Sequence, residues 1–69
     1  MLYTVFNLNE RKHKILQLIA DGLKSDVIAE IMSSSHRTIE GTRNILIDSF
    51  GAKNTAHLIA LAFRYGVLK

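Results

Sequence analysis

Apolar residues recur along the chain with the 3.6-residue period of amphipathic helices, in four separate runs. Residues that favour helix starts precede three of the runs: Asn9, Ser35 and Asn54. Glycines, which commonly end helices in the left-handed conformation, follow three runs: Gly22, Gly51 and Gly66. The pattern predicts an all-α fold with four helices at about 10–20, 25–32, 36–50 and 55–65.

The second and third runs are joined by a short corner of three serines at 33–35. The second run has only about two turns, so packing must hold it, whereas the third places Ile39, Leu46 and Phe50 on one face. A short and a long helix joined by such a corner are typical of a helix-turn-helix pair. A generic small helical bundle fits the same pattern equally well, so periodicity alone leaves both folds open.

The composition limits the chemistry that is available to the chain. A domain of 69 residues buries only about 60% of the surface of its unfolded chain and has little material for a catalytic cleft. There is no cysteine, and His13, His36 and His57 lack the i, i+4 spacing of a helical metal pair. We therefore expect no enzymatic activity, no metal and no cofactor.

The chain is basic, with a formal net charge of +3 and a pI near 9.6. This charge is compatible with a polyanionic partner, although ordinary solvated lysines make many small domains basic. The apolar stretch at 1–6 is too short to cross a membrane and has no charged leader or small-residue cleavage site. We expect a soluble cytoplasmic protein that makes no membrane contact.

Five fragments, in order and in register, resemble a known family. They are LNER at 8–11, ILQLIADGL at 15–23, IAE at 28–30, SHRTI at 35–39 and FGAKN at 50–54. Together they resemble the LuxR-type (GerE-like) helix-turn-helix domain, the DNA-binding half of NarL-like and FixJ-like response regulators. The similarity runs from about residue 8 to residue 68 without a gap, which divides the chain into an N-terminal extension at 1–7 and the domain at 8–69.

The resemblance implies a bacterial transcription regulator that binds double-stranded DNA near promoters. Its third helix is expected in the major groove, and its fourth helix often mediates dimerisation. No small-molecule ligand is implied for this domain. Four positions depart from the family pattern: Lys12, Ser34, Glu40 and Thr42. Glu40 stands where a basic residue is usual, and it is expected either to accept a hydrogen bond from a cytosine amino group, which we favour, or to be repelled by phosphates.

Opposite the apolar face of the third helix lie the residues that we expect to contact bases: Arg37, Glu40, Gly41, Asn44 and Ile45. An asparagine matches adenine, an exposed isoleucine suits a thymine methyl group, and a glycine permits close approach. Helix starts and nearby polar side chains are candidates for phosphate contacts: Ser35, His36, Thr38, Arg43, Lys53, Asn54 and Thr55. A solvated surface without a partner is the alternative for the five base-contact candidates, and a stem that covers apolar surface is the alternative for Arg43.

The fourth run is apolar nearly all round, which is typical of a helix buried on more than one side. We expect its side with His57, Leu61 and Arg64 to form a homodimer contact, with plain solvent exposure as the alternative for His57 and Arg64. A second function class also fits this helix. The domain could pair with, or block, another regulator through the fourth helix without contacting DNA.

Overall fold

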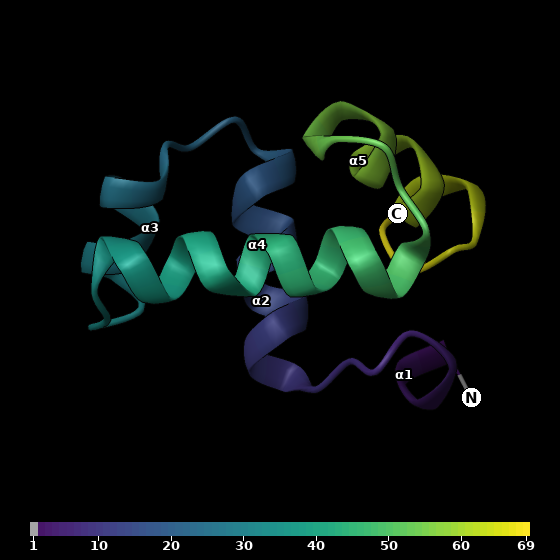
Figure 1. Cartoon of the computed structure of the whole chain (residues 1–69), viewed down its shortest axis with the longest axis horizontal. Helices are drawn as coiled ribbons and strands as arrows, with labels where there is room; N and C mark the ends of the chain where they lie inside the picture. The colour runs from purple at the N-terminus through teal and green to yellow at the C-terminus, as the bar shows by residue number, and fades with distance from the viewer. Residues whose placement is uncertain (1) are drawn as a thin grey trace.

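The computed structural model describes residues 2–69; Met1, the first residue of the expected extension, lies outside them. The described chain is all-helical (Figure 1), with the helices α1 Leu2–Val5, α2 Glu10–Ala20, α3 Ser25–Ile31, α4 His36–Phe50 and α5 Thr55–Arg64. The all-α class is confirmed. The helices α2 and α4 have the predicted bounds, α3 and α5 end one residue early, and α1 lies where no helix was predicted.

Side chains at three helix starts explain these boundaries locally. Asn9, Ser35 and Asn54 each accept a hydrogen bond from the backbone N–H three residues later, at 2.8, 3.1 and 2.8 Å. The three predicted N-caps are thereby confirmed, and each such cap stabilises its helix by about 1 kcal/mol. At the other end of α4, Gly51 has φ of 67°, a left-handed conformation that glycine adopts without a steric penalty.

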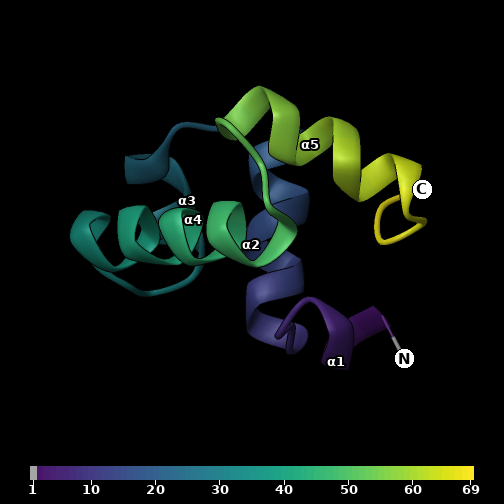
Figure 2. The same cartoon turned by 45° about the vertical axis from the view of Figure 1, so that its right-hand side comes forward.

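The long helix α4 crosses α2, with α3 beside its first half and α5 beside its second half (Figures 1 and 2). One buried cluster joins α2 and α3 to the start of α4: Ile15, Leu18, Ile28, Ala29 and Ile39. The other joins α2 to the end of α4, to α5 and to the C-terminal segment: Leu16, Leu46, Phe50, Leu58, Leu61, Ala62, Val67 and Leu68. The predicted inner face of α4 is confirmed, and its opposite side remains open.

Aromatic and polar contacts attach the segment before α2 to the rest of the fold. The ring of Phe6 stacks on Phe50, with centroids 4.2 Å apart, and on Tyr65 at 5.3 Å. The Nε2–H of His13 donates to the carbonyl of Val67 at 3.0 Å. Its Nδ1 then accepts from the hydroxyl of Tyr3 at 2.7 Å. Phe6 therefore packs onto the ends of α4 and α5, and Tyr3 is attached to α2.

Candidate nucleic-acid interface

The outward side of α4 forms an open surface, which we call the recognition face and define as Arg37, Gly41, Asn44 and Ile45. All four residues are exposed, and Ile45 is 45% exposed although it is strongly apolar. Asp48, which the sequence analysis did not select, is exposed one turn further along the same side. Its i+4 spacing from Asn44 places it on the same helix side and could have identified it from the sequence. The geometry makes this side available to a partner, while contact with DNA stays a prediction.

Gly41 has no internal reason to be a glycine. It is helical, and its φ is not among the positive values found at other glycines of the chain. A Cβ built on it meets nothing within 4 Å. A glycine in a helix interior is about 1 kcal/mol less favourable than alanine. No packing contact at Gly41 offsets this loss of stability.

Glu40 is held by two hydrogen-bond partners, and a third polar residue lies nearby. Its Oε2 accepts a hydrogen bond from the hydroxyl of Ser25 on α3, and its Oε1 accepts one from the guanidinium of Arg43. His36 Nε2 lies 3.9 Å from Oε2. The hydrogen bond to Arg43, followed by that to Ser25, lowers the pKa of Glu40 below its usual value.

Glu40 and Arg43, which were expected at bases and at phosphates, bind each other in the free chain. Their contacts with DNA stay predictions. Only 34% of the Glu40 side chain and 30% of the Arg43 side chain are exposed. Helical spacing gave the angular position of Glu40 but could not reveal Ser25, which comes from another helix.

The residues expected near phosphates are divided between two helix starts. At the start of α4, Ser35, His36 and Thr38 are exposed, and the hydroxyl of Ser35 is already engaged with the backbone N–H and the hydroxyl of Thr38. Lys53 and Asn54 are exposed at the start of α5, whereas Thr55 is half-buried. Thr55 is therefore less accessible than Lys53 and Asn54.

The side of α5 expected to form a dimer contact is assigned incorrectly at Leu61. This residue is only 6% exposed and belongs to the core cluster with Leu58 and Ala62. Of the other two expected residues, Arg64 is exposed, and the half-buried His57 accepts a hydrogen bond at Nδ1 from the backbone N–H of Lys53 at 3.0 Å. The uncovered side carries three exposed residues with i, i+4 and i+7 spacing: Ala56, Ala60 and Phe63.

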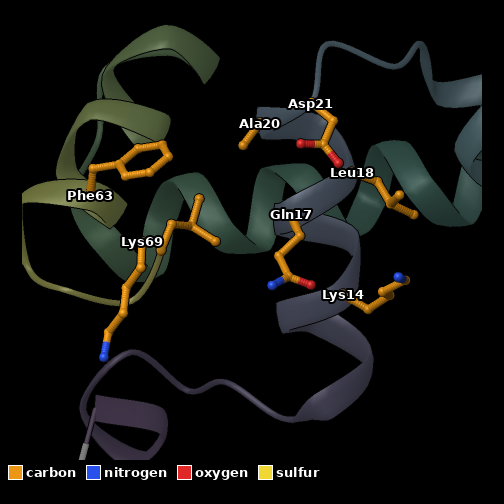
Figure 3. Close-up of a pocket in the computed structure, with 8 residues that line it drawn as sticks. Lys14, Gln17, Leu18, Ala20, Asp21, Phe63 and Lys69 are labelled. Carbon is orange, nitrogen blue, oxygen red and sulfur yellow. The ribbon is translucent and has the colours of Figure 1, made fainter.

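A shallow hollow of about 260 Å³ lies between α2 and the C-terminal segment (Figure 3). Phe63 faces α2 across it, and Lys14, Asp21 and Lys69 line its rim. Among residues 2–69, no three potential metal ligands lie together. In the same described part of the chain, no helix has the length and apolar character needed to cross a membrane. The recognition face is thus the best-defined candidate site.

Comparison with protein families gives one match, to the bacterial regulatory proteins of the luxR family, over residues 7–62. The matched segment contains α2, α3, α4 and most of α5. Comparisons with curated proteins and with solved structures give no match. The family match confirms the resemblance drawn from the five sequence fragments. The chain therefore belongs to the luxR family of bacterial regulatory proteins, whose helix-turn-helix domains are DNA-binding transcription regulators and not enzymes.

Proposed function

We propose that this chain binds double-stranded DNA sequence-specifically as a transcription regulator, with α4 in the major groove. The observation that carries the proposal is the recognition face, which combines an open helix side with a glycine that the fold itself does not require. A major groove about 12 Å wide admits an α-helix. Close approach of the α4 backbone to base edges supplies the reason for Gly41 that internal packing does not.

Each side chain on this face has a defined chemical use. The amide of Asn44 presents a donor and an acceptor, the pair that matches adenine in the major groove. Ile45 offers apolar contact to a thymine methyl group. This contact would also remove the exposed apolar surface of Ile45 from water. Arg37, one turn before Gly41, matches guanine or a phosphate through its guanidinium.

Phosphate contacts position such a domain without selecting a sequence. The start of α4, capped by Ser35, and the start of α5, capped by Asn54, both favour anions through their free N–H groups and helix dipoles. Lys53 and His36 are exposed beside these starts. Lys53 supplies positive charge that attracts the backbone.

We further propose that two copies pair through α5, using the side with Ala56, Ala60 and Phe63 in place of Leu61. The two alanines permit close approach of helices, and Phe63, which is 50% exposed, supplies apolar area at the end of the contact. Such a homodimer presents two α4 helices to two half-sites of a palindromic operator. We also propose that this bacterial regulator acts in the cytoplasm, where its DNA partner lies, as the effector domain of a response regulator.

The second candidate function is a protein-binding module that uses α5 and does not contact DNA. One observation favours it: the charged residues of α4 are two arginines, one glutamate and one aspartate, which sum to zero with histidine neutral. A recognition helix without net charge gains little from the electrostatic attraction that drives non-specific DNA binding. The contribution of α4 itself to DNA binding therefore depends on direct base contacts more than on charge.

The deciding experiment selects bound duplexes from a random pool and then measures affinity by fluorescence anisotropy at several salt concentrations. We expect enrichment of one motif and an affinity that falls linearly on a logarithmic salt scale. Asn44→Ala should relax the preference at one base pair, with a loss of about 1–3 kcal/mol. Lys53→Ala should weaken all duplexes alike. No enrichment, together with salt-insensitive binding to another protein, would support the protein-binding module instead.

A further inference from the structure

The contacts of Glu40 span both helices of the helix-turn-helix pair. Ser25 is the first residue of α3, and Glu40 lies in the second turn of α4. No other side-chain hydrogen bond among the described residues links α3 to α4. Glu40 therefore forms the polar connection between the two helices, in addition to their apolar packing.

Each oxygen of the Glu40 carboxylate accepts one hydrogen bond, one from Ser25 and the other from Arg43, and these two partners orient the carboxylate. A carboxylate that selects cytosine must direct an acceptor at the groove. The partner Arg43 is likewise engaged and carries one of the two positive charges of α4. The same pair of contacts therefore removes a candidate base contact and a candidate phosphate contact from the open surface.

Building on the proposed function, we infer that Glu40 is a positioning residue that ties α4 to α3 and holds the Arg43 guanidinium away from the DNA backbone. Glu40 then contacts no base. Its presence lowers the number of phosphates that the domain neutralises, so that binding depends more on the recognition face and less on charge. This role also accounts for an acidic residue on a helix that enters an anionic groove.

The counterion slope, the change of log affinity with log salt concentration, measures this role directly. Each additional phosphate contact steepens the slope by about 0.9. Glu40→Gln keeps the length of the side chain and an acceptor for Ser25 but removes the charge that retains Arg43. We expect one additional phosphate contact, which adds a roughly 3.5-fold loss of affinity between about 50 and 200 mM salt.

The experiment compares four proteins on a labelled duplex selected by the wild-type chain: wild type, Glu40→Gln, Arg43→Met and the double variant. Arg43→Met retains an apolar stem and removes the guanidinium. The inference expects a steeper slope for Glu40→Gln alone, with the double variant matching Arg43→Met. Ser25→Ala serves as a structural control, because it loses the link to α3 while Arg43 stays held; it should lower the melting temperature and leave the slope unchanged.

Three outcomes would overturn the inference while the proposed function stands. The slope of Glu40→Gln could equal that of wild type. The Glu40→Gln change could also steepen the slope to the same extent in the Arg43→Met background. Repeated selection with Glu40→Gln could also yield a motif changed at one base pair, which would show that Glu40 contacts a base. If neither wild type nor Glu40→Gln binds any duplex, the proposed function fails and the inference fails with it.

Discussion

Replacement of Gly41 by alanine separates the stability of the fold from its function. Gly41 lies inside α4, and the added Cβ would meet no atom within 4 Å, so nothing in the free chain opposes the change. Alanine restricts the unfolded chain and favours the helix, which together stabilise the protein by about 1 kcal/mol. For a domain of this size, such a gain raises the melting temperature by about 4–8 °C.

The same methyl group should weaken DNA binding. It would project from the centre of the exposed recognition face, where the proposed close approach of the backbone to the groove requires the absence of a side chain. We expect Gly41→Ala to be more stable and yet to bind its selected duplex at least tenfold more weakly, since about 1.4 kcal/mol of lost contact corresponds to a factor of ten. A more stable variant cannot lose affinity through unfolding.

The assays are thermal denaturation followed by circular dichroism and fluorescence anisotropy with the selected duplex. Gly51→Ala is the matched control, because its φ of 67° places alanine in the left-handed region, where a side chain costs about 1–2 kcal/mol. It should therefore lower the melting temperature. A Gly41→Ala variant that melts below wild type would refute the account of packing, and one that is stabilised with unchanged affinity would refute close approach to DNA.

Three further predictions concern α5, the cap of α4 and acid stability. Phe63→Ser should leave the fold intact and shift a dimer to monomer in sedimentation velocity, whereas Leu61→Ala, at a residue only 6% exposed, should lower the free energy of unfolding by about 2–5 kcal/mol. A dimer that persists in both variants, or a Phe63→Ser variant that unfolds, would contradict the assignment of the two sides of α5. Ser35→Ala removes the 3.1 Å cap hydrogen bond and should lower the urea midpoint by an amount equivalent to about 1 kcal/mol, and an unchanged midpoint would show that the cap contributes nothing. Arg43 and Ser25 lower the pKa of Glu40 in the folded chain. The stability that this residue contributes is therefore complete above the usual glutamate pKa of about 4.3 and is lost as the pH falls below it towards the lowered value. Urea titrations from pH 7 to pH 3 should show a smaller loss of stability for Glu40→Gln than for wild type, and an equal loss in the two proteins would count against the pairing.

Local interactions made much of the fold predictable. The caps at Asn9, Ser35 and Asn54 act on backbone groups only three residues away, so the sequence itself contains both partners. Gly51 ends α4 by its own conformational freedom. The inner face of α4 followed from helical spacing, because that helix has one apolar side and one polar side.

Spacing failed where a helix has no polar side or where a partner comes from elsewhere in the chain. α5 is apolar nearly all round, and its period could not decide whether Leu61 or Phe63 faces the core; the packing of α4 and the returning C-terminal segment decided it. The contact of Glu40 with Ser25 spans 15 residues and depends on the angle between two helices. The helix α1 has only four residues, and no periodic signal distinguished it.

The sequence by itself determined the number of the main helices, their bounds to within one residue, three of their N-caps and the family, because those features depend on neighbours within one or two turns. The tertiary structure alone decided which side of α5 stays open, where Phe6 stacks and which partners hold Glu40. These features require contacts between distant segments, and the geometry of such contacts exists only once the apolar faces of the helices have packed together.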